Sequence, residues 1–470
     1  MNRVVLSVLA GPLAFVITQV IPVAGLKPEG HFALSTFAWV LAWWVLQPIP
    51  WAITGMLPLV ILPLAGAMPL QDVAALYGQR ILFFLAGVML FGHALEKHGL
   101  GKRIAIKILS IPGLATSGDR LILVIMIVSA VVSSMVDDSA TVAMMIPIAM
   151  SIAKFAGGGA PRFMEAVALS VLYGSAAGGM MTPAGVPFNP LSISLLDQLT
   201  GYKINFVQWT LTGVILGAAT IPLYYLALKF LLPSEVRSIP DGAKYFREER
   251  ERMGPMSRAE KNLLFIFFVM IVLWFLPAIV AIRALDIWIV PAIAAVLLFI
   301  LPVDARKGEM TLSSKDFQNG IAWNVLFLVV SGSALAVAMT RLGVIDAFGS
   351  VVKSRISAGV LPWFAGFMTN AVSHFASGGV AATGMIATIL FPIAHQLGVN
   401  PAIIARIIPG AALAVCFPWA GAAAAAAFAS GAITFRGMFR IGFVATILVT
   451  AEIIALSMIL IPALNAFTAP

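Results

Sequence analysis

Long apolar stretches recur along the chain, and short polar segments separate them. Each stretch is long enough to cross a bilayer as a helix, which takes about 20 residues. A membrane-spanning β-strand needs only about 10 residues and alternates apolar with polar positions. The pattern therefore predicts an all-α polytopic membrane protein. The stretches that resemble simple spans are residues 4–22, 32–48, 51–68, 81–96, 206–231, 262–283, 286–303, 320–340 and 436–465.

Two further regions, residues 119–200 and 357–430, do not resemble simple spans, because each carries polar residues and Gly or Pro in its middle. We expect each to hold one re-entrant hairpin followed by one broken helix, which gives about 11 transmembrane helices plus two re-entrant hairpins. With the N-terminus in the cytoplasm, most Lys and Arg then lie on the cytoplasmic side, as the positive-inside rule requires. The loop at residues 232–261 lies on that side and divides the chain almost in half.

The composition supports this fold class. Of the 470 residues, 61% are hydrophobic and 10% are charged, whereas soluble domains average about 45–50% and about 25%. We therefore do not expect an enzyme. The net charge of +9 reflects basic loops, so we expect no nucleic-acid partner. The single cysteine, Cys416, excludes intrachain disulfides and cysteine metal clusters.

The first apolar run resembles a signal peptide, because Arg3 precedes it. No small-x-small cleavage site ends the run cleanly, and more spans follow at once. We therefore expect the run to be the first transmembrane helix.

The two irregular regions resemble each other. Residues 137–141 are answered by residues 373–377, and residues 182–185 by residues 417–421. An odd number of predicted crossings separates the copies, so they enter the membrane from opposite sides. Such an inverted repeat is an architecture of secondary transporters, which bind substrates and ions at broken helices near mid-membrane.

The first hairpin turn carries two adjacent acids, Asp137 and Asp138. Two carboxylates at mid-membrane depth are costly unless they are paired, protonated or bound to a cation. The alternative is that they only cap a helix N-terminus. We favour a functional role, because a cap needs one acid and not two.

The first broken helix, residues 178–190, holds three prolines and three glycines in thirteen residues. Such a segment cannot be a continuous helix, and inside the membrane it offers carbonyls to a cation and amides to an anion. We expect Na⁺ as a possible coupling ion near Asp137, Asp138, Thr182 and Gly185. The residues expected to couple cations or protons are Ser134, Asp137, Asp138, Thr141, Gly178, Gly179, Thr182 and Gly185.

The second copy is poorer in polar side chains. His374 occupies the place that matches Asp138, although a lone histidine is usually structural. The second break, residues 417–427, is a proline followed by an alanine run, and its small residues favour close helix packing. Arg406 and Glu452 lie inside later spans, where they can pair with each other, meet lipid head groups or bind substrate.

With these pieces in place, the chain resembles the divalent anion:sodium symporter family from about residue 30 to the C-terminus. The residues that carry the resemblance are 81–87 with 94–97, 140–147, and 178–189. The resemblance implies a homodimer with two re-entrant hairpins and an elevator motion of a transport domain against a scaffold. It also implies C4-dicarboxylate, citrate or sulfate as substrate, usually driven by sodium.

The same resemblance divides the chain into expected parts. These are residues 1–118 and 262–356 for the scaffold, 119–231 and 357–470 for the two halves of the transport domain, and 232–261 for a cytoplasmic linker. The expected substrate-binding residues are Asp138, Ser139, Pro187, Asn189, Ser373 and His374.

The chain departs from the family at both hairpin turns, where the family carries Ser-Asn-Thr. Residues 137–139 read Asp-Asp-Ser, and residues 373–375 read Ser-His-Phe. A carboxylate about 4 Å from a dianion is repelled by about 4 kcal/mol per charge pair at an effective dielectric near 20. Either a cation or a proton neutralises the acids, or the substrate is not a dianion.

Two functions remain open. The first is a secondary active transporter of a small anion, coupled to Na⁺, to protons carried by Asp137, Asp138 and His374, or to both. The alternative is a cation/proton antiporter that uses the acid pair. A smaller possibility is a protein that binds without translocating. In each case we expect an integral membrane protein of a bacterial inner membrane, with lipid as a partner.

Overall fold

The computed structural model describes residues 3–23, 25–114, 116–157, 160–239, 242–278, 280, 282, 285–344, 346–347, 356–375 and 378–468. The N-terminal half consists of α1 (Arg3–Val20), α2 (Pro28–Leu46), α3 (Trp51–Thr54), α4 (Leu57–Leu64), α5 (Leu70–Ala75), α6 (Arg80–Lys97), α7 (Leu100–Leu109), α8 (Gly118–Ser133), α9 (Asp138–Gly157), α10 (Pro161–Gly179), α11 (Phe188–Thr200), α12 (Phe206–Leu231) and α13 (Gly242–Arg252).

The C-terminal half consists of α14 (Arg258–Phe275), a short 3-10 helix (Leu276–Ala278), α15 (Val290–Ile300), α16 (Ser314–Gly320), α17 (Trp323–Arg341), α19 (Leu361–Phe375), α20 (Gly379–Gln396), α21 (Pro401–Leu413), α22 (Ala422–Ala429) and α23 (Phe435–Thr468). Between α15 and α16, the strands β1 (Pro302–Asp304) and β2 (Glu309–Met310) form a small antiparallel hairpin.

The predicted all-α membrane architecture is confirmed in its main lines. Six helices of the described chain are long and apolar enough to cross a membrane: Leu70–Lys97, Asp138–Gly157, Phe206–Leu231, Trp323–Arg341, Gly379–Gln396 and Phe435–Ala463. Shorter apolar helices accompany them. The count of about 11 crossings stays a prediction.

Two predicted spans are less regular than expected. The span at residues 51–68 is divided into α3 and α4, because Pro58 has no amide to continue the ladder and starts a new helix instead. Within the predicted span at residues 286–303, only α15 is helical, and Pro291 lies in the first turn of α15. The predicted span 262–283 ends among residues 279, 281 and 283, which lie outside the described part.

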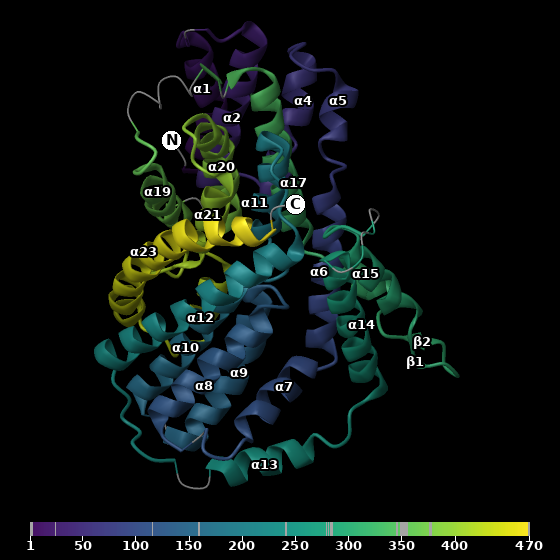
Figure 1. The fold of residues 1–470 in the computed structure, drawn as a ribbon, viewed down its shortest axis with the longest axis vertical. Helices are drawn as coiled ribbons and strands as arrows, with labels where there is room; N and C mark the ends of the chain where they lie inside the picture. The colour runs from purple at the N-terminus through teal and green to yellow at the C-terminus, as the bar shows by residue number, and fades with distance from the viewer. Residues whose placement is uncertain are drawn as a thin grey trace.

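Each of the two irregular regions contains a helical hairpin followed by a broken helix, as predicted. In the first copy α8 and α9 form the hairpin, and α10 and α11 form the broken helix. In the second copy α19 and α20 form the hairpin, and α21 and α22 form the broken helix. The first hairpin lies toward the end of the molecule that carries α7 and α13, whereas the second lies toward the end that carries α1 and α2 (Figure 1). This arrangement is the one that an inverted repeat produces.

The first hairpin packs tightly on the first broken helix. A Cβ at Gly174 would lie 2.2 Å from the carbonyl oxygen of Met126, and one at Gly178 would lie 2.0 Å from that of Ala130. Only glycine allows α8 and α10 to approach this closely. The contact fixes the hairpin turn against the break that follows α10.

Three hydrophobic clusters form the core. One joins α7–α10 and α12 to α21–α23, a second joins α6, α14, α15 and α17 to α11, α20 and α21, and a third lies among α2, α4, α5 and α17. Members of the two irregular regions therefore share cores with each other and with the helices around them.

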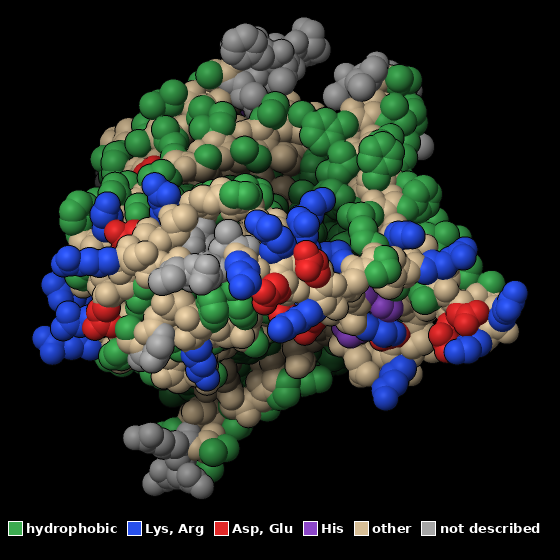
Figure 2. All heavy atoms as spheres, turned by 90° about the horizontal axis from the view of Figure 1, so that it is seen from below, with side chains coloured by type: hydrophobic (Ala, Val, Ile, Leu, Met, Phe, Trp, Pro, Cys, Tyr) green, Lys and Arg blue, Asp and Glu red, His purple; other side chains and the backbone are tan. Residues whose placement is uncertain are grey.

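Charged side chains gather at one end of the molecule. Figure 2 looks onto the end that carries α7 and α13 and shows Lys and Arg in a band, with hydrophobic side chains to either side. Arg103 of α7 anchors the region: its Nε donates to Glu260 at 2.6 Å, and its Nη1 donates to the carbonyl of Gly254 at 2.8 Å. The predicted linker is thus held against α7 where it leads into α14.

Asp316 in α16 is a second anchor at this end. Its carboxylate accepts hydrogen bonds from Lys97 at 2.8 Å and from the amide of Ser313 at 2.7 Å, and it lies 3.2 Å from Nε2 of His93. Burial by itself would raise the pKa of Asp316, but the hydrogen bonds from Lys97, Ser313 and His93 outweigh it and hold the pKa well below its ordinary value. The ionised carboxylate ties α16 to the end of α6.

Candidate functional site

A cavity of about 360 Å³ lies where the two hairpin turns and the two helix breaks meet. Side chains of α6 and α17 close its opposite side. The lining residues that matter for the argument are Phe84, Val88, Met89, His93, Glu96, Asp137, Asp138, Ser139, Pro187, Phe188, Val325, Gly378, Gly379, Val380, Gly421, Ala422 and Ala423. Both halves of the repeat therefore contribute to one chamber.

Four helix N-termini converge on this cavity. The first residues of α9, α11, α20 and α22 are Asp138, Phe188, Gly379 and Ala422, and all four line it. The first amides of a helix have no partner within the helix, and the helix dipole places about half a positive charge there. The cavity therefore has a positive backbone environment that both copies of the repeat supply.

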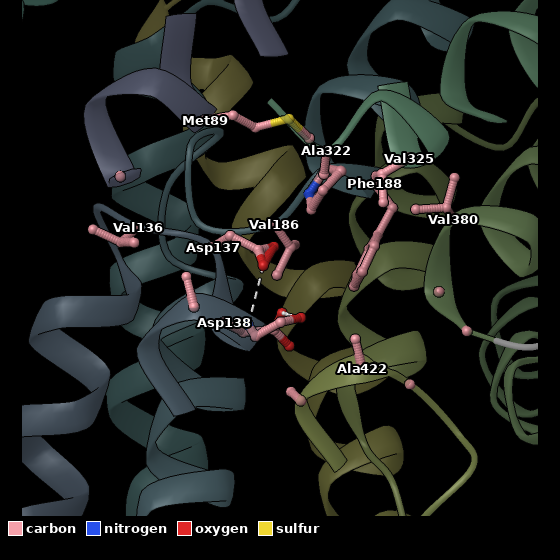
Figure 3. A pocket seen from close by; sticks show the side chains of 18 of the residues that line it. Met89, Val136, Asp137, Asp138, Val186, Phe188, Ala322, Val325, Val380 and Ala422 are labelled. Atoms are coloured by element: carbon pink, nitrogen blue, oxygen red, sulfur yellow. Dashed lines mark hydrogen bonds between the residues drawn. The ribbon is translucent and has the colours of Figure 1, made fainter. Parts of the chain in front are cut away.

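The two acids of the first turn face the cavity. Figure 3 shows the carboxylates of Asp137 and Asp138 directed into the space between the hairpin and Phe188. The Oδ1 of Asp137 accepts the amide of Ser139 at 3.1 Å, and the Oδ1 of Asp138 accepts the hydroxyl of Ser139 at 3.2 Å. Asp137 thus caps α9, as the alternative interpretation held, yet both acids also stand on the cavity wall.

Hydroxyl groups join the first turn to the first break. The Thr182 hydroxyl donates to the carbonyl of Ser134 and accepts the amide of Ala184 at 3.1 Å. The Ser175 hydroxyl donates to the carbonyl of Asp138 at 3.1 Å. Thr182 was predicted to bind a cation, but its side chain is engaged in holding the turn and the break together.

Asn189 is buried behind the cavity wall and acts as a clamp. Its Nδ2 donates to the carbonyls of Gly179 and Thr182, both at 2.8 Å. A Cβ at Gly185 would lie 2.4 Å from the carbonyl oxygen of Gly179, so the loop folds back on itself there. Of the two predicted substrate ligands in this segment, Pro187 lines the cavity and Asn189 does not.

Three further predicted coupling residues also lie beside the cavity rather than in it. The hydroxyl of Ser134 donates to the carbonyl of Val131 at 2.8 Å, and that of Thr141 donates to the carbonyl of Val136 at 3.4 Å. Gly178 serves the close approach of α8 to α10. The structure brings these residues to the base of the turn, where they shape the backbone.

The second turn corrects the prediction for Ser373 and His374. Both residues belong to α19, and the turn comes after them, since α20 begins at Gly379. Gly379, and not His374, is therefore the counterpart of Asp138 as the first residue of the second arm. Residues 376 and 377 of the predicted polar stretch lie outside the described chain. The sequence-based register was wrong because it followed the polar side chains instead of Gly378, whose φ of 117° favours glycine.

His374 is a buried bridge between α19 and the second break. Its Nδ1 lies 2.7 Å from the carbonyl oxygen of Asn370, and its Nε2 lies 3.0 Å from the amide nitrogen of Cys416. A carbonyl only accepts and an amide only donates, so Nδ1 carries the hydrogen and Nε2 accepts. This pattern defines a neutral imidazole with both nitrogens engaged. Ser373 donates to the carbonyl of Asn370 at 2.8 Å, and neither Ser373 nor His374 is among the residues that line the cavity.

Asn370 also clamps the second break, as Asn189 clamps the first. Its Nδ2 donates to the carbonyl of Ala411 at 3.0 Å and to that of Ala414 at 2.7 Å, where α21 ends. Each break is thus held open by one buried amide side chain that satisfies two free carbonyls.

Comparison with known proteins decides the family. The sodium:sulfate symporter transmembrane region matches residues 3–465 of the chain. The chain belongs to this family, the divalent anion:sodium symporters.

Curated relatives and a solved structure agree with this assignment. The sodium-dependent dicarboxylate transporter SdcS of Staphylococcus saprophyticus is 27% identical, over 97% of this chain and 91% of its own length. The SdcS of Staphylococcus aureus is also 27% identical, over 93% and 87%. The YdaH transporter of Alcanivorax borkumensis has a similar fold, with a TM-score of 0.55 and 12% identity over 98% of each chain. The family and these relatives are transporters and not enzymes, and the chain is an integral membrane protein.

In this symporter-family chain, Arg406 and Glu452 form no direct ion pair, which was one of the interactions expected for them, and each side chain has another partner. The Arg406 guanidinium donates to the carbonyl of Met180 at the end of α10, and its Cζ lies 4.4 Å from the centre of the Trp209 ring. Glu452 accepts the hydroxyl of Thr220 at 2.9 Å. Arg406 thus carries a charge from the second copy to the end of the first broken helix.

Some of the family member's functional surface could not be read from the sequence. Most of the cavity wall of α6 and α17 consists of ordinary apolar span residues, such as Val88 and Val325, and only tertiary contact shows which of them face the chamber. Among the described residues, no group of three or more His, Cys, Asp or Glu side chains is placed to hold a metal ion. A transported cation at the first turn would therefore meet the carboxylates of Asp137 and Asp138 and the Ser139 hydroxyl.

Polar contacts join α6, α11 and α17 at the end of α6 opposite to His93 and Glu96. Arg80 bonds Asp197 of α11 at 2.7 Å and Asp286 at 3.3 Å. Gln198 of α11 donates to Gln79 at 2.9 Å, and Ser333 of α17 donates to Gln79 at 2.7 Å. The cavity extends toward the other end of α6, because His93 and Glu96 line it.

Proposed function

We propose that this chain is a secondary active transporter that carries a small anion together with Na⁺, with H⁺ as an additional or substitute coupling ion. One observation supports this proposal above the others: the N-termini of α9, α11, α20 and α22 point into a single cavity between the two halves of an inverted repeat. Such convergence favours an anion in the cavity. The relatives named as sodium-dependent dicarboxylate transporters support sodium as the driving ion.

The charges of the site explain why a cation accompanies the anion. The four N-termini supply roughly two positive charges, at about half a charge each. The carboxylates of Asp137 and Asp138 cancel this amount when both are ionised. An anion therefore binds well only when Na⁺ or H⁺ neutralises the acid pair, and this requirement couples the two fluxes.

The position of the cavity suits an elevator motion. Its polar side belongs to residues 119–231 and 357–470, which we propose as the transport domain, and its apolar side belongs to α6 and α17 of the proposed scaffold, residues 1–118 and 262–356. The linker at residues 232–261 connects the two halves. We place the protein in a bacterial inner membrane as a homodimer surrounded by lipid.

A second candidate, cation/proton antiport, is favoured by a different observation. Asp137 and Asp138 both line the cavity, and no Lys or Arg is among the lining residues of the described chain. Two adjacent carboxylates in such a place suit alternating occupancy by Na⁺ and protons. In this function the cavity exchanges cations and needs no organic cargo.

Flux measurements in proteoliposomes separate the two functions. An inward Na⁺ gradient is imposed at constant pH, and uptake of labelled succinate, citrate, sulfate and monocarboxylates is followed. Anion uptake that depends on the Na⁺ gradient supports the proposed symport. Sodium efflux driven by a pH gradient, with no response to any anion, overturns it in favour of antiport.

A further inference from the structure

Most of the cavity wall opposite the hairpin turns is apolar, and the polar residues His93, Glu96 and Asn319 line the cavity near the α7 end of α6. Phe84, Val88 and Met89 of α6 and Val325 of α17 form it, and Phe188 at the start of α11 continues it (Figure 3). Side chains of this kind bind hydrocarbon by removing it from water. They offer no hydrogen bond to a carboxylate or sulfate oxygen.

The end of the cavity at the first turn is negative. Asp137 and Asp138 stand there, and the amide of Ser139 already bonds the carboxylate of Asp137. An anionic group placed at this end meets two like charges and finds one of the nearby amides already occupied. The end suits a cation.

Among the described residues, the end of the cavity at the second copy offers backbone alone, and residues 376 and 377 lie outside the described part of the chain. Gly378, Gly379 and Val380 line it beside residues 420–424, so the described side chains there carry neither charge nor hydroxyl. Neither α20 nor α22 has a side-chain cap, which leaves their first amides available as donors. This end has room for one anionic group.

We infer that the cargo is a monocarboxylate with an apolar body, and not a dicarboxylate or sulfate. The inference rests on the proposed anion transport and names its substrate class. The carboxylate meets the amides of the second copy, the hydrocarbon body lies along Val88, Met89 and Phe188, and the coupling cation stays with the acids of the first turn.

A dicarboxylate fits this cavity poorly. Its second carboxylate would lie either against the apolar wall or beside an acid, which is Asp137 and Asp138 at the turn and Glu96 near the α7 end of α6. The first position leaves a charge without partners, and the second places like charges together. Sulfate has no apolar part, so it gains nothing from the wall. A site of this type discriminates strongly against an unpaired polar group.

Matched ligands test the inference on the purified full-length chain. Pentanoate and glutarate have the same carbon skeleton, and one carries a methyl group where the other carries a carboxylate. Binding is measured by thermal shift and by uptake into proteoliposomes, with phenylacetate and sulfate as further probes, and every measurement is made both with and without Na⁺. We expect pentanoate and phenylacetate to bind at least about tenfold more tightly than glutarate, with no response to sulfate.

Two variants test which residues cause the preference for pentanoate over glutarate. Asp138→Asn removes one repelling charge and should narrow the preference for pentanoate over glutarate by about tenfold, while Asp119→Asn at the far end of α8 serves as the matched control and leaves it unchanged. Val88→Thr makes the wall polar at nearly constant volume and should weaken pentanoate binding without improving that of sulfate.

The outcomes separate the inference from the function on which it rests. Glutarate or sulfate binding as tightly as pentanoate overturns the monocarboxylate assignment and leaves anion transport intact. No response to any anion, with a response to Na⁺ alone, overturns both. A preference that Asp138→Asn leaves unchanged shows that the acid pair does not select the cargo and overturns the inference as stated.

Discussion

The two copies of the repeat share one architecture but differ in chemistry at the cavity. In the first copy the turn presents Asp137, Asp138 and Ser139 to the chamber, whereas the described part of the second turn presents Gly378 and Gly379. Away from the chamber the copies agree, because one buried amide clamps each break: Asn189 in the first and Asn370 in the second. The parts that hold the backbone open are therefore kept, and the parts that face the cargo are free to differ.

This difference indicates a division of labour. Side-chain oxygens at the first turn suit a cation, and bare amides at the second suit an anion. A cavity with two equal ends would treat both ends of a cargo alike. In the proposed function, an unequal cavity would fix which end of the transported anion faces the second copy. It would also place the coupling ion beside the other end alone.

The largest effect is expected from neutralising the first turn. Asp137→Asn combined with Asp138→Asn removes both charges while it keeps the volume, and the apparent affinity for Na⁺ should fall by about 10- to 100-fold, since contacts with charged groups contribute about 1.5–3 kcal/mol. Sodium-dependent uptake in proteoliposomes measures this loss. If Na⁺ affinity is unchanged, the first turn is not the cation end, and the comparison between the copies fails.

A smaller effect is expected from filling the second turn. A Cβ at Gly379 would lie 2.7 Å from Cε1 of Phe188, so Gly379→Ala must displace that ring, which lines the cavity proposed to bind the anion. Anion affinity should fall several-fold while the response to Na⁺ is retained. Gly384→Ala on the same helix is the matched control, because its Cβ would meet Leu191 at an ordinary 3.9 Å. Loss of the Na⁺ response in Gly379→Ala would mean that the two ends do not act separately.

The His374 bridge between α19 and the second break predicts an effect on stability. His374→Ala removes the acceptor for the amide of Cys416 and should lower the free energy of unfolding by about 1–3 kcal/mol. The melting temperature measures this cost. The pH profile of transport should keep its shape, because both imidazole nitrogens are already bonded in the neutral ring. A profile that flattens in this variant would return His374 to a role in proton coupling.

The smallest effect is expected at Asp316, an acid that Lys97 pairs, in contrast to Asp137 and Asp138 at the cavity. Asp316 lies in α16, outside the membrane-spanning helices, and the hydrogen bonds that it accepts lower its pKa in the folded protein. Its contribution to stability is therefore fully present above the pKa of the unfolded state and is lost as pH falls through the folded pKa. Asp316→Asn should lower the melting temperature at pH 7, and the gap to the parent should close as pH falls below about 4. A gap that stays constant down to pH 3 would show that Asp316 acts through packing alone.

The helices and their breaks could be predicted from the sequence because the signals are local. Apolar length predicts spans, and the Gly and Pro residues at 178–190 cannot form one helix. The acids at 137 and 138 were conspicuous because so few charges occur in apolar surroundings. These features depend on neighbours along the chain.

Features that depend on neighbours in space were missed or misplaced. In the sequence, Val88 resembles any other residue of an apolar span. Nothing in the sequence near Arg406 indicates that its side chain reaches Met180 in the other copy. The pattern of polar residues predicts the second turn too early in the chain, because it pairs His374 with Asp138. Gly378 was the available signal, since a turn that needs positive φ selects glycine over a polar side chain.

The contacts of Arg80 have a consequence for the rate of the transport cycle. Arg80 belongs to the proposed scaffold and Asp197 to the proposed moving part, so an elevator step has to separate them. The two side chains are 58% and 22% exposed, and dissolved salt therefore screens their attraction. If the proposed elevator motion operates, ionic strength would influence how long the protein stays in this conformation, whichever cation supplies it. The same protein would then transport at different rates in fresh water and in brine.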